Sequence, residues 1–256
     1  MINNPVGVLS LSKREVVRFI SLSGQTVFPP IVSSILFMFI FGVAIGNQLN
    51  FNLTDLSYLQ FIVPGLVTMH VITSAYENTT SSLFIARWHN HIHEVLLSPL
   101  SYFEMVLGLL AGGVARGTVV SAGVFLGSML FAPLSFHNFF LLIYFVLTIS
   151  VIFSCLGMIG ALWAEDFGML NVWHIYLIVP LVLLGGVFHP IALLPHVVQI
   201  ASKFNPMFYL VEGVRYSVTG MIHTSVWGCA LVAMGMALAS FYSTVYLFKI
   251  GYKLRT

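Results

Sequence analysis

The stretch from His89 to Glu94 carries the side chains best suited to chemistry. His89, His91 and His93 alternate there, and Glu94 follows directly. Imidazole and carboxylate groups can bind zinc, but His93-Glu94 is not followed by the second histidine of the HExxH pattern of zinc proteases. Histidines on a solvated loop more often make polar contacts. We therefore expect no metal site and no catalytic residue here.

Other catalytic patterns are missing from the sequence. It contains no GxxxxGK[ST] phosphate-binding loop, no GxSxG nucleophile motif and no compact selectivity loop typical of a channel. We expect a chain that is not an enzyme and holds no cofactor. Any ATP and magnesium chemistry then belongs to a partner subunit.

A second set of polar residues recurs at helical spacing within an apolar run. The set is His70, Thr73, Ser74, Glu77 and Ser81. Such a stripe cannot comfortably face lipid, so it faces protein or water. Arg116 lies inside a later apolar run and needs a partner. Glu77 could pair with it and hold two helices together, or both could line a translocation pathway.

The composition places these residues in a bilayer. Of 256 residues, 59% are hydrophobic and 7% charged, and the mean hydropathy is +0.98, whereas soluble domains carry about 25% charged residues. With about 20 residues per span, the chain accommodates six spans. The net charge of +2 gives no indication of nucleic-acid binding. Cys155 and Cys229 lie in apolar runs, which predicts buried free thiols.

We therefore expect an all-α polytopic membrane protein with a single transmembrane domain. The predicted parts are an interfacial helix at 1–25, spans at 26–46, 58–83, 102–131, 139–163, 172–188 and 225–248, a coupling loop at 87–101 and an outer re-entrant segment at 189–224. The third span is rich in glycines spaced by four, which lets helices approach closely. The outer segment is too interrupted for a full span and predicts short helices that dip into the membrane.

The N-terminal residues have an amphipathic pattern. The apolar set is Leu9, Val16, Phe19 and Ile20, and the charged set is Arg14, Glu15 and Arg18. Lys13 falls on the apolar side and would have to snorkel. This pattern indicates a helix that lies in the membrane interface. An ordinary solvated helix is the alternative.

The polar loop itself predicts a short helix from His89 to Leu97. Ile92, Val95 and Leu96 fall on one side of it at helical spacing. Ser98 precedes Pro99 and is pushed out of the helical region, which ends the helix.

The basic residues fall mostly on one side of the six-span arrangement. That side holds Lys13, Arg14, Arg18, Arg87, Lys249, Lys253 and Arg255, and the other holds Lys203 and Arg215. By the positive-inside rule, both termini and the loop at Arg87 are cytoplasmic.

Four stretches carry a family resemblance. They are FIVPGLV at 61–67, EVLLSPLSYFE at 94–104, GGVFHPIALLP at 185–195 and FNPMFYLVEGVRY at 204–216. In order and spacing, over nearly the whole chain, they resemble the permease subunits of type-2 family ABC exporters of bacterial inner membranes, which move drugs, lipids or polysaccharides. The resemblance implies a dimer, with itself or a related permease, substrate passage between the two subunits, and a coupling helix docked on a separate ATPase.

The resemblance implies a contact set for that ATPase: Arg87, His89, His93, Glu94, Leu97 and Pro99. The cargo is expected to be hydrophobic or amphipathic. One alternative is a proton-coupled secondary transporter that uses Glu77 and His70. Another is an integral-membrane enzyme or assembly factor. Glu212 and Arg215, three residues apart, predict a local ion pair.

Overall fold

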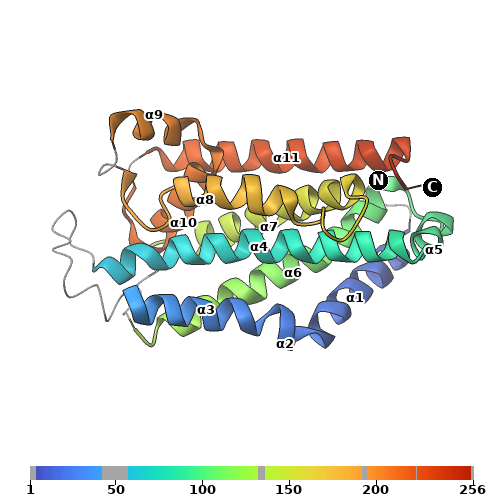
Figure 1. Ribbon diagram of the computed structural model, residues 1–256, viewed down its shortest axis with the longest axis horizontal. Helices are drawn as coiled ribbons and strands as arrows, with labels where there is room; N and C mark the ends of the chain where they lie inside the picture. The colour runs from blue at the N-terminus through green and yellow to red at the C-terminus, as the bar shows by residue number, and fades with distance from the viewer. Residues whose placement is uncertain (1–3, 42–56, 132–135, 192–194, 223, 255–256) are drawn as a thin grey trace.

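The computed structural model describes residues 4–41, 57–131, 136–191, 195–222 and 224–254, which form helices and no strand (Figure 1). The helices are α1 Pro5–Ser21, α2 Ser23–Thr26, α3 Phe28–Met38, α4 Tyr58–Trp88, α5 Ile92–Leu97, α6 Tyr102–Ser128, α7 Phe139–Trp163, the π-helix η2 His174–Ile178, α8 Val179–Leu184, α9 His196–Phe204, α10 Pro206–Thr219 and α11 Val226–Ile250. The all-α prediction is confirmed for these residues.

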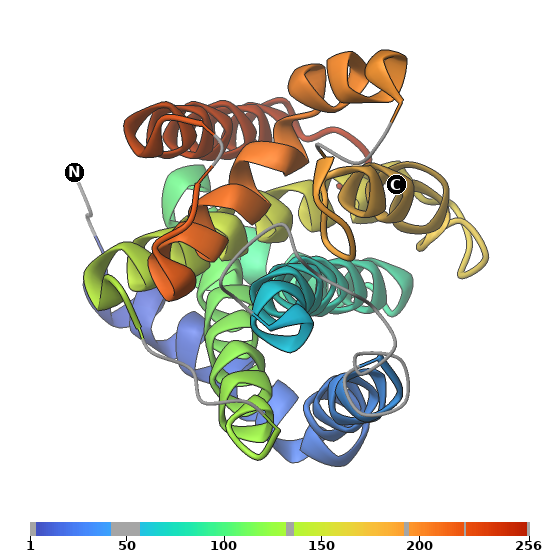
Figure 2. The ribbon, with the colours of Figure 1, turned by 90° about the vertical axis from the view of Figure 1, so that its left-hand side faces the viewer.

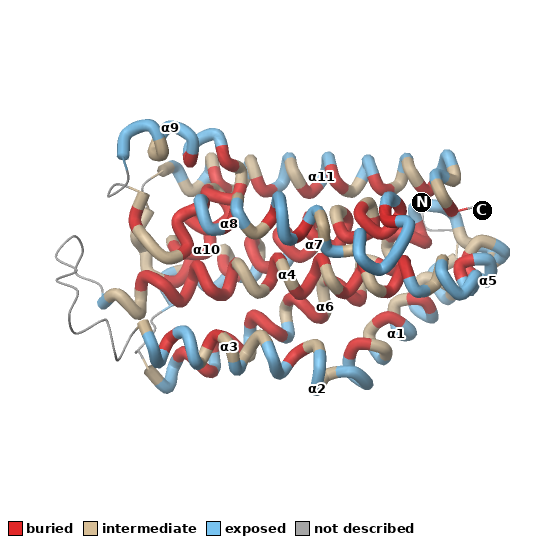
Figure 3. Tube along the Cα trace, in the orientation of Figure 1, coloured by how far each residue is buried: buried red, intermediate tan, exposed pale blue. Residues whose placement is uncertain are grey.

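Helix α4 lies at the centre of the bundle. It packs against α6 and α7 along its length and against α10 at one end, as the end-on view shows (Figure 2). Buried residues concentrate on α4, α7 and α10 (Figure 3). Helix α5 and both termini lie at one end of the bundle, and α9 and α10 lie at the other. Any displacement of α4 must therefore involve α6 and α7.

Local sequence signals fix the starts of the long helices. At α4 the Ser57 side chain accepts from the amide of Gln60, whose side chain accepts from the amide of Ser57, and Ser101 and Glu104 make the same capping box at α6. Asn138 caps α7 by accepting from the amide of Leu141. These caps satisfy amides that the first helical turn leaves without partners.

The glycines of α6 let three helices approach it closely, as predicted. A Cβ on Gly112 would lie 2.7 Å from the Cβ of Glu15 on α1, and a Cβ on Gly113 would collide with Ser154 on α7. Farther along, a Cβ on Gly127 would lie 3.0 Å from Ile35 on α3. Small residues on α6 thus set the distances to α1, α7 and α3.

Five of the helical segments are long and apolar enough to cross a membrane. They are Ser23–Phe41, Tyr58–Trp88, Tyr102–Ser128, Phe139–Trp163 and Val226–Ile250. The helix in the predicted span at 172–188 is shorter than expected, because it ends at Leu184; its apolar part, His174–Leu184, is about 16 Å long at 1.5 Å per residue. The chain leaves the helix through Gly185 and Gly186, the latter at φ +84°. Residues 42–46 of the first predicted span, and Arg255, lie outside the described residues.

The predicted faces of the N-terminal helix are wrong in one important respect. Glu15 was placed on the polar face with Arg14 and Arg18, but its side chain is 1% exposed. The glycine-lined surface of α6 brings Glu15 inside, where Ser82 Oγ donates to its carboxylate over 2.6 Å. A buried carboxylate is stable only with such partners. The interfacial placement of α1 stays a prediction.

The segment between α8 and α11 forms two short helices, as predicted. Helix α10 packs against α4, α7 and α11. The predicted ion pair is confirmed: Arg215 donates to Glu212 on the next turn, and it also donates to the carbonyl of Gly186 over 2.6 Å. Its guanidinium lies 4.1 Å from the ring centre of Phe61 on α4. Whether these helices dip into the membrane stays a prediction.

The two cysteines are placed as the sequence predicts. Cys155 on α7 and Cys229 on α11 are both buried and free. Their thiols pack in the bundle as small apolar groups.

Candidate functional site

The short helix α5 stands at one end of the bundle (Figure 1). It begins at Ile92, later than the predicted start at His89, because the chain turns at Asn90 with φ +60°. Ile92 and Val95 are buried, so the predicted apolar side is confirmed. The helix ends at Leu97, and Ser98 donates its hydroxyl to the carbonyl of Val95 over 2.6 Å. The buried side fixes α5 to the bundle.

The other side of α5 and its flanks are open to solvent. Exposed residues there are His89, His93, Glu94, Leu97 and Pro99. Leu97 stands out, because 86% of its surface is exposed on a helix of only six residues. The exposed side of α5 thus presents an apolar side chain beside polar and charged ones.

One cleft lies along α5, and a second lies at its N-terminal end. One, of about 280 Å³, lies between α5 and α1 and is lined by residues that include Gly7, Arg14 and Glu94. The other, of about 230 Å³, is lined by residues that include Trp88 and Lys253. Helix α5 therefore has a hollow along one flank and another at its N-terminal end, both open to a partner surface.

Arg87 does not belong to the exposed set. Helix α4 runs to Trp88, past the predicted end of the second span at residue 83, so Arg87 lies in its last turn and not in a loop. Its guanidinium donates to the carbonyls of Ala161, Leu162 and Ala164 at the end of α7. These carbonyls have no helical partner of their own. Arg87 thus joins the ends of α4 and α7.

Lys253 adds a second cation to the same end of α7. Its ammonium donates to the carbonyl of Trp163 over 3.2 Å and to the carboxylate of Glu165 over 2.7 Å. The hydrogen bond from Lys253 lowers the pKa of Glu165 from its ordinary value. Cations at a helix C-terminus also meet a favourable dipole.

Glu104 fixes the start of α1 beside α5. Its carboxylate accepts from the amide of Asn4 over 2.7 Å and from the amide of Ser101 over 2.7 Å. The sequence analysis did not single out Glu104, although Ser101-x-x-Glu104 has the spacing of a capping box. Helices α1 and α6 are therefore tied together next to α5.

The polar stripe of α4 is the open strip of an otherwise buried helix. His70, Thr73, Glu77 and Ser81 are partly exposed, whereas Ser74 is fully buried. His174 of η2 lies 3.2 Å from Thr73, measured from Nε2 to Oγ1. The stripe thus faces η2 on one side of the molecule.

The predicted pairing of Glu77 with Arg116 is confirmed. Arg116 Nη2 donates to Glu77 Oε2 over 3.1 Å, and Arg116 Nε donates to the carbonyl of Thr26 over 3.2 Å. The Arg116 side chain is 6% exposed and the Glu77 side chain 40%. The arginine therefore joins three chain segments, while one side of its carboxylate partner remains open.

A further charged group continues from this pair toward α1, and the sequence reading missed it. Arg18 donates to the carbonyl and to the side chain of Asn78 over 2.8 and 3.1 Å, and it lies 3.4 Å from Glu15. The sequence analysis placed Arg14, Glu15 and Arg18 on the polar face of an interfacial helix. In the structure Arg14 is 46% exposed and Arg18 27%, and only Glu15 is enclosed by the neighbouring helices.

The three loop histidines do not converge on a common point with other ligands. The ring centres of His89 and His91 are 5.9 Å apart. Over the described ranges, no three His, Cys, Asp or Glu side chains are grouped as a metal site would require.

Comparison with known proteins places this arrangement among membrane permeases. Residues 7–219 match the family model described as ABC-2 type transporter. The chain is 37% identical over 217 residues to the inner membrane transport permease YadH of Escherichia coli K12, covering 84% of each chain. It is 24% identical over 185 residues to nodulation protein J of Rhizobium leguminosarum bv. trifolii, covering 71% of this chain and 69% of that one. These relatives do not favour a proton-coupled secondary transporter.

Proposed function

Because this chain belongs to the ABC-2 type transporter family, a family of multi-pass membrane permeases, we propose that it is the permease subunit of an exporter driven by a separate ATP-hydrolysing subunit. ATP and magnesium are held by that partner. The observation that carries the proposal is α5, a helix with a buried apolar side, an exposed leucine and two adjoining clefts.

The partner ATPase docks on the exposed side of α5. Its contact set is His89, His93, Glu94, Leu97 and Pro99. Arg87 contributes indirectly, since it holds the end of α4, just before α5, against α7. Leu97 supplies the apolar contact of this set, since 86% of its surface is exposed.

The bundle end that carries α5 is cytoplasmic. Arg87, Lys249 and Lys253 support this orientation, because basic residues favour the cytoplasmic side of a membrane. Both chain termini then lie on that side of an inner membrane, and α9 and α10 lie outside. The predicted span at 172–188 acts as the sixth crossing; its apolar helix His174–Leu184 covers about half of the bilayer core, and the chain on either side of it completes the crossing.

Two permease chains enclose the translocation pathway, either two copies of this chain or this chain and a related one. The polar stripe of α4 lines that pathway: His70, Thr73 and Glu77 are partly exposed on it. Arg116 orients the Glu77 carboxylate through their ion pair of 3.1 Å. The cargo is hydrophobic or amphipathic, of the drug, lipid or polysaccharide class.

Transport depends on the firm attachment of α5 to the bundle, because this attachment transmits the movement of the ATPases to the permease. Closure of the two ATPases moves α5, and the buried Ile92 and Val95 carry that movement into the bundle. The tie between Glu104 and Asn4 moves α1 with α6. The permease pair then changes from inward-open to outward-open, which is alternating access.

The test is purification of the tagged chain in mild detergent, with mass spectrometry and an ATPase assay on the recovered complex. We expect a stoichiometric ATP-binding subunit. Glu94→Ala and Leu97→Asp should each lower its recovery and its stimulated hydrolysis at least several-fold without unfolding the bundle. Val197→Asp is the matched control, since Val197 is 77% exposed on α9 at the opposite end.

Two results would contradict the proposal. One is recovery of the chain alone, without ATPase activity, under conditions that keep it folded. The other is full transport by a Glu94→Ala and Leu97→Asp double variant, because a coupling helix without these side chains should not transmit the ATPase movement.

A further inference from the structure

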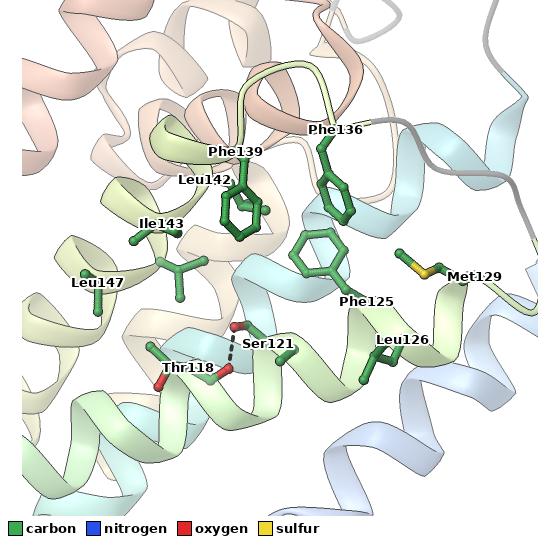
Figure 4. A pocket seen from close by; sticks show the side chains of 12 residues that line it. Thr118, Ser121, Phe125, Leu126, Met129, Phe136, Phe139, Leu142, Ile143 and Leu147 are labelled. Carbon is green, nitrogen blue, oxygen red and sulfur yellow. Dashed lines mark hydrogen bonds between the residues drawn. The ribbon is translucent and has the colours of Figure 1, made fainter.

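A groove opens between the halves of α6 and α7 that lie farther from α5 (Figure 4). Its volume is about 400 Å³. Phe125 and Met129 of α6 line one wall, Ile143 and Leu147 of α7 line the other, and Phe136 lies at the end. The groove is large enough for a small apolar molecule or a hydrocarbon chain.

The groove offers no free polar group among the side chains that line it. Its two hydroxyl groups are already used by their own helix: Thr118 Oγ1 donates to the carbonyl of Val114 over 2.9 Å, and Ser121 Oγ donates to the carbonyl of Thr118 over 2.8 Å, the dashed line in Figure 4. Water or a polar cargo would find no partner there. The occupant has to be apolar along its whole length.

The groove extends over about half a membrane thickness. From Thr118 to Met129, eleven helical steps of 1.5 Å give about 16 Å, and a bilayer core is about 30 Å thick. The lining segments belong to two helices long and apolar enough to span it. A straight apolar chain confined to one leaflet has this length.

The groove lies away from the polar stripe of α4. In Figure 1, α3, α4 and α8 lie toward the viewer and α6 and α7 lie behind them, and the end-on view in Figure 2 agrees. The stripe with Glu77 faces η2 on the near side, where His174 meets Thr73. A permease pair that encloses the stripe leaves the groove facing bilayer.

We propose that the groove between α6 and α7 binds one acyl chain of a bilayer phospholipid, in the leaflet farther from α5. The headgroup then lies beside the exposed His137, whose ring packs against Tyr216 with 5.1 Å between ring centres. The exposed Leu126 and Phe139 border the groove at that end. The bound lipid fills the space between α6 and α7.

The test is photolabelling of the full chain, without any partner, in nanodiscs doped with a phosphatidylethanolamine that carries a diazirine in mid-chain. Adducts are mapped by mass spectrometry. We expect them to concentrate on residues 118–147, and Ala122→Trp, which fills the groove, should reduce them at least five-fold. Ala239→Trp is the matched control, since Ala239 is also exposed, on α11.

Three outcomes would overturn the inference. Adducts spread evenly over α3, α11 and the groove, and equal in both tryptophan variants, would show ordinary lipid contact. Disulfide-linked dimers of a Leu126→Cys variant without lipid adducts would show that a second copy fills the groove. Loss of the adduct during ATP turnover of the assembled exporter would assign the groove to cargo. Because the first two outcomes are read on the chain alone, failure of the proposed ATPase partnership would leave them interpretable.

Discussion

Replacing Arg87 by alanine should loosen the joint between α4 and α7. The guanidinium donates to three carbonyls at the end of α7, and two of the three distances are 3.3 Å, so one bond carries most of the energy. A hydrogen bond to a charged group contributes about 1.5–3 kcal/mol. Because the side chain is only partly buried, we expect a loss of about 1.5 kcal/mol, near the low end of that range.

The assay is thermal unfolding of the purified chain in one detergent, followed by ATPase binding. A loss of this size lowers the Tm by roughly 3–6 °C in a chain of this length. Arg87→Lys should lose about half as much, because an ammonium keeps one of the bonds. His89→Ala is the control for the melting temperature alone, since His89 is exposed and belongs to the proposed ATPase contact set. If Arg87→Ala has the same Tm as His89→Ala but binds the ATPase less well, Arg87 is a docking contact. The proposed role of Arg87 in joining α4 to α7 is then refuted.

Three further predictions follow from close packing and buried charge. Gly112→Val should prevent stable folding, because its Cβ would lie 2.7 Å from a side-chain atom of α1. Gly235→Val is the control and should melt as wild type, because Gly235 has open space around it. Detergent size-exclusion chromatography compares the amount of folded protein that each variant gives. Glu77→Gln should lower the free energy of unfolding by about 1–2 kcal/mol, because it leaves the buried Arg116 guanidinium without its countercharge. A double-mutant cycle with Arg116→Gln should show a coupling energy between the two residues. A coupling energy of zero would contradict a stabilising ion pair. Glu104→Ala should lower stability by about 1–2 kcal/mol through loss of the α6 cap and speed proteolysis of the N-terminus; an unchanged cleavage rate would disprove the tie to α1.

The sequence alone determined the elements whose signals are local. Helix α7 was predicted at its observed bounds, because a continuous apolar run lies between a capping Asn138 and Glu165. The short helix α5 was predicted from the spacing of Ile92 and Val95 and from Pro99, although its start was placed too early at His89. Membrane class and the family resemblance likewise depended on composition and on the order of the motifs, whereas the orientation drawn from the basic residues stays a prediction.

The pairing of Glu77 with Arg116 was predictable in kind but not in geometry. A charge inside an apolar run must find a partner. Glu77 and Arg116 have opposite charges and lie on neighbouring predicted spans. The distance of 3.1 Å depends on how α4 and α6 pack.

Only the tertiary structure decided where the remaining charges lie. Glu15 is buried because the glycines of α6 admit the backbone of α1, and Arg87 faces inward because the end of α7 leaves carbonyls within its reach. Helical periodicity predicts neither position, because it describes one helix at a time. A charge is placed by the free energy of its partners in the fold, and those partners lie far along the chain.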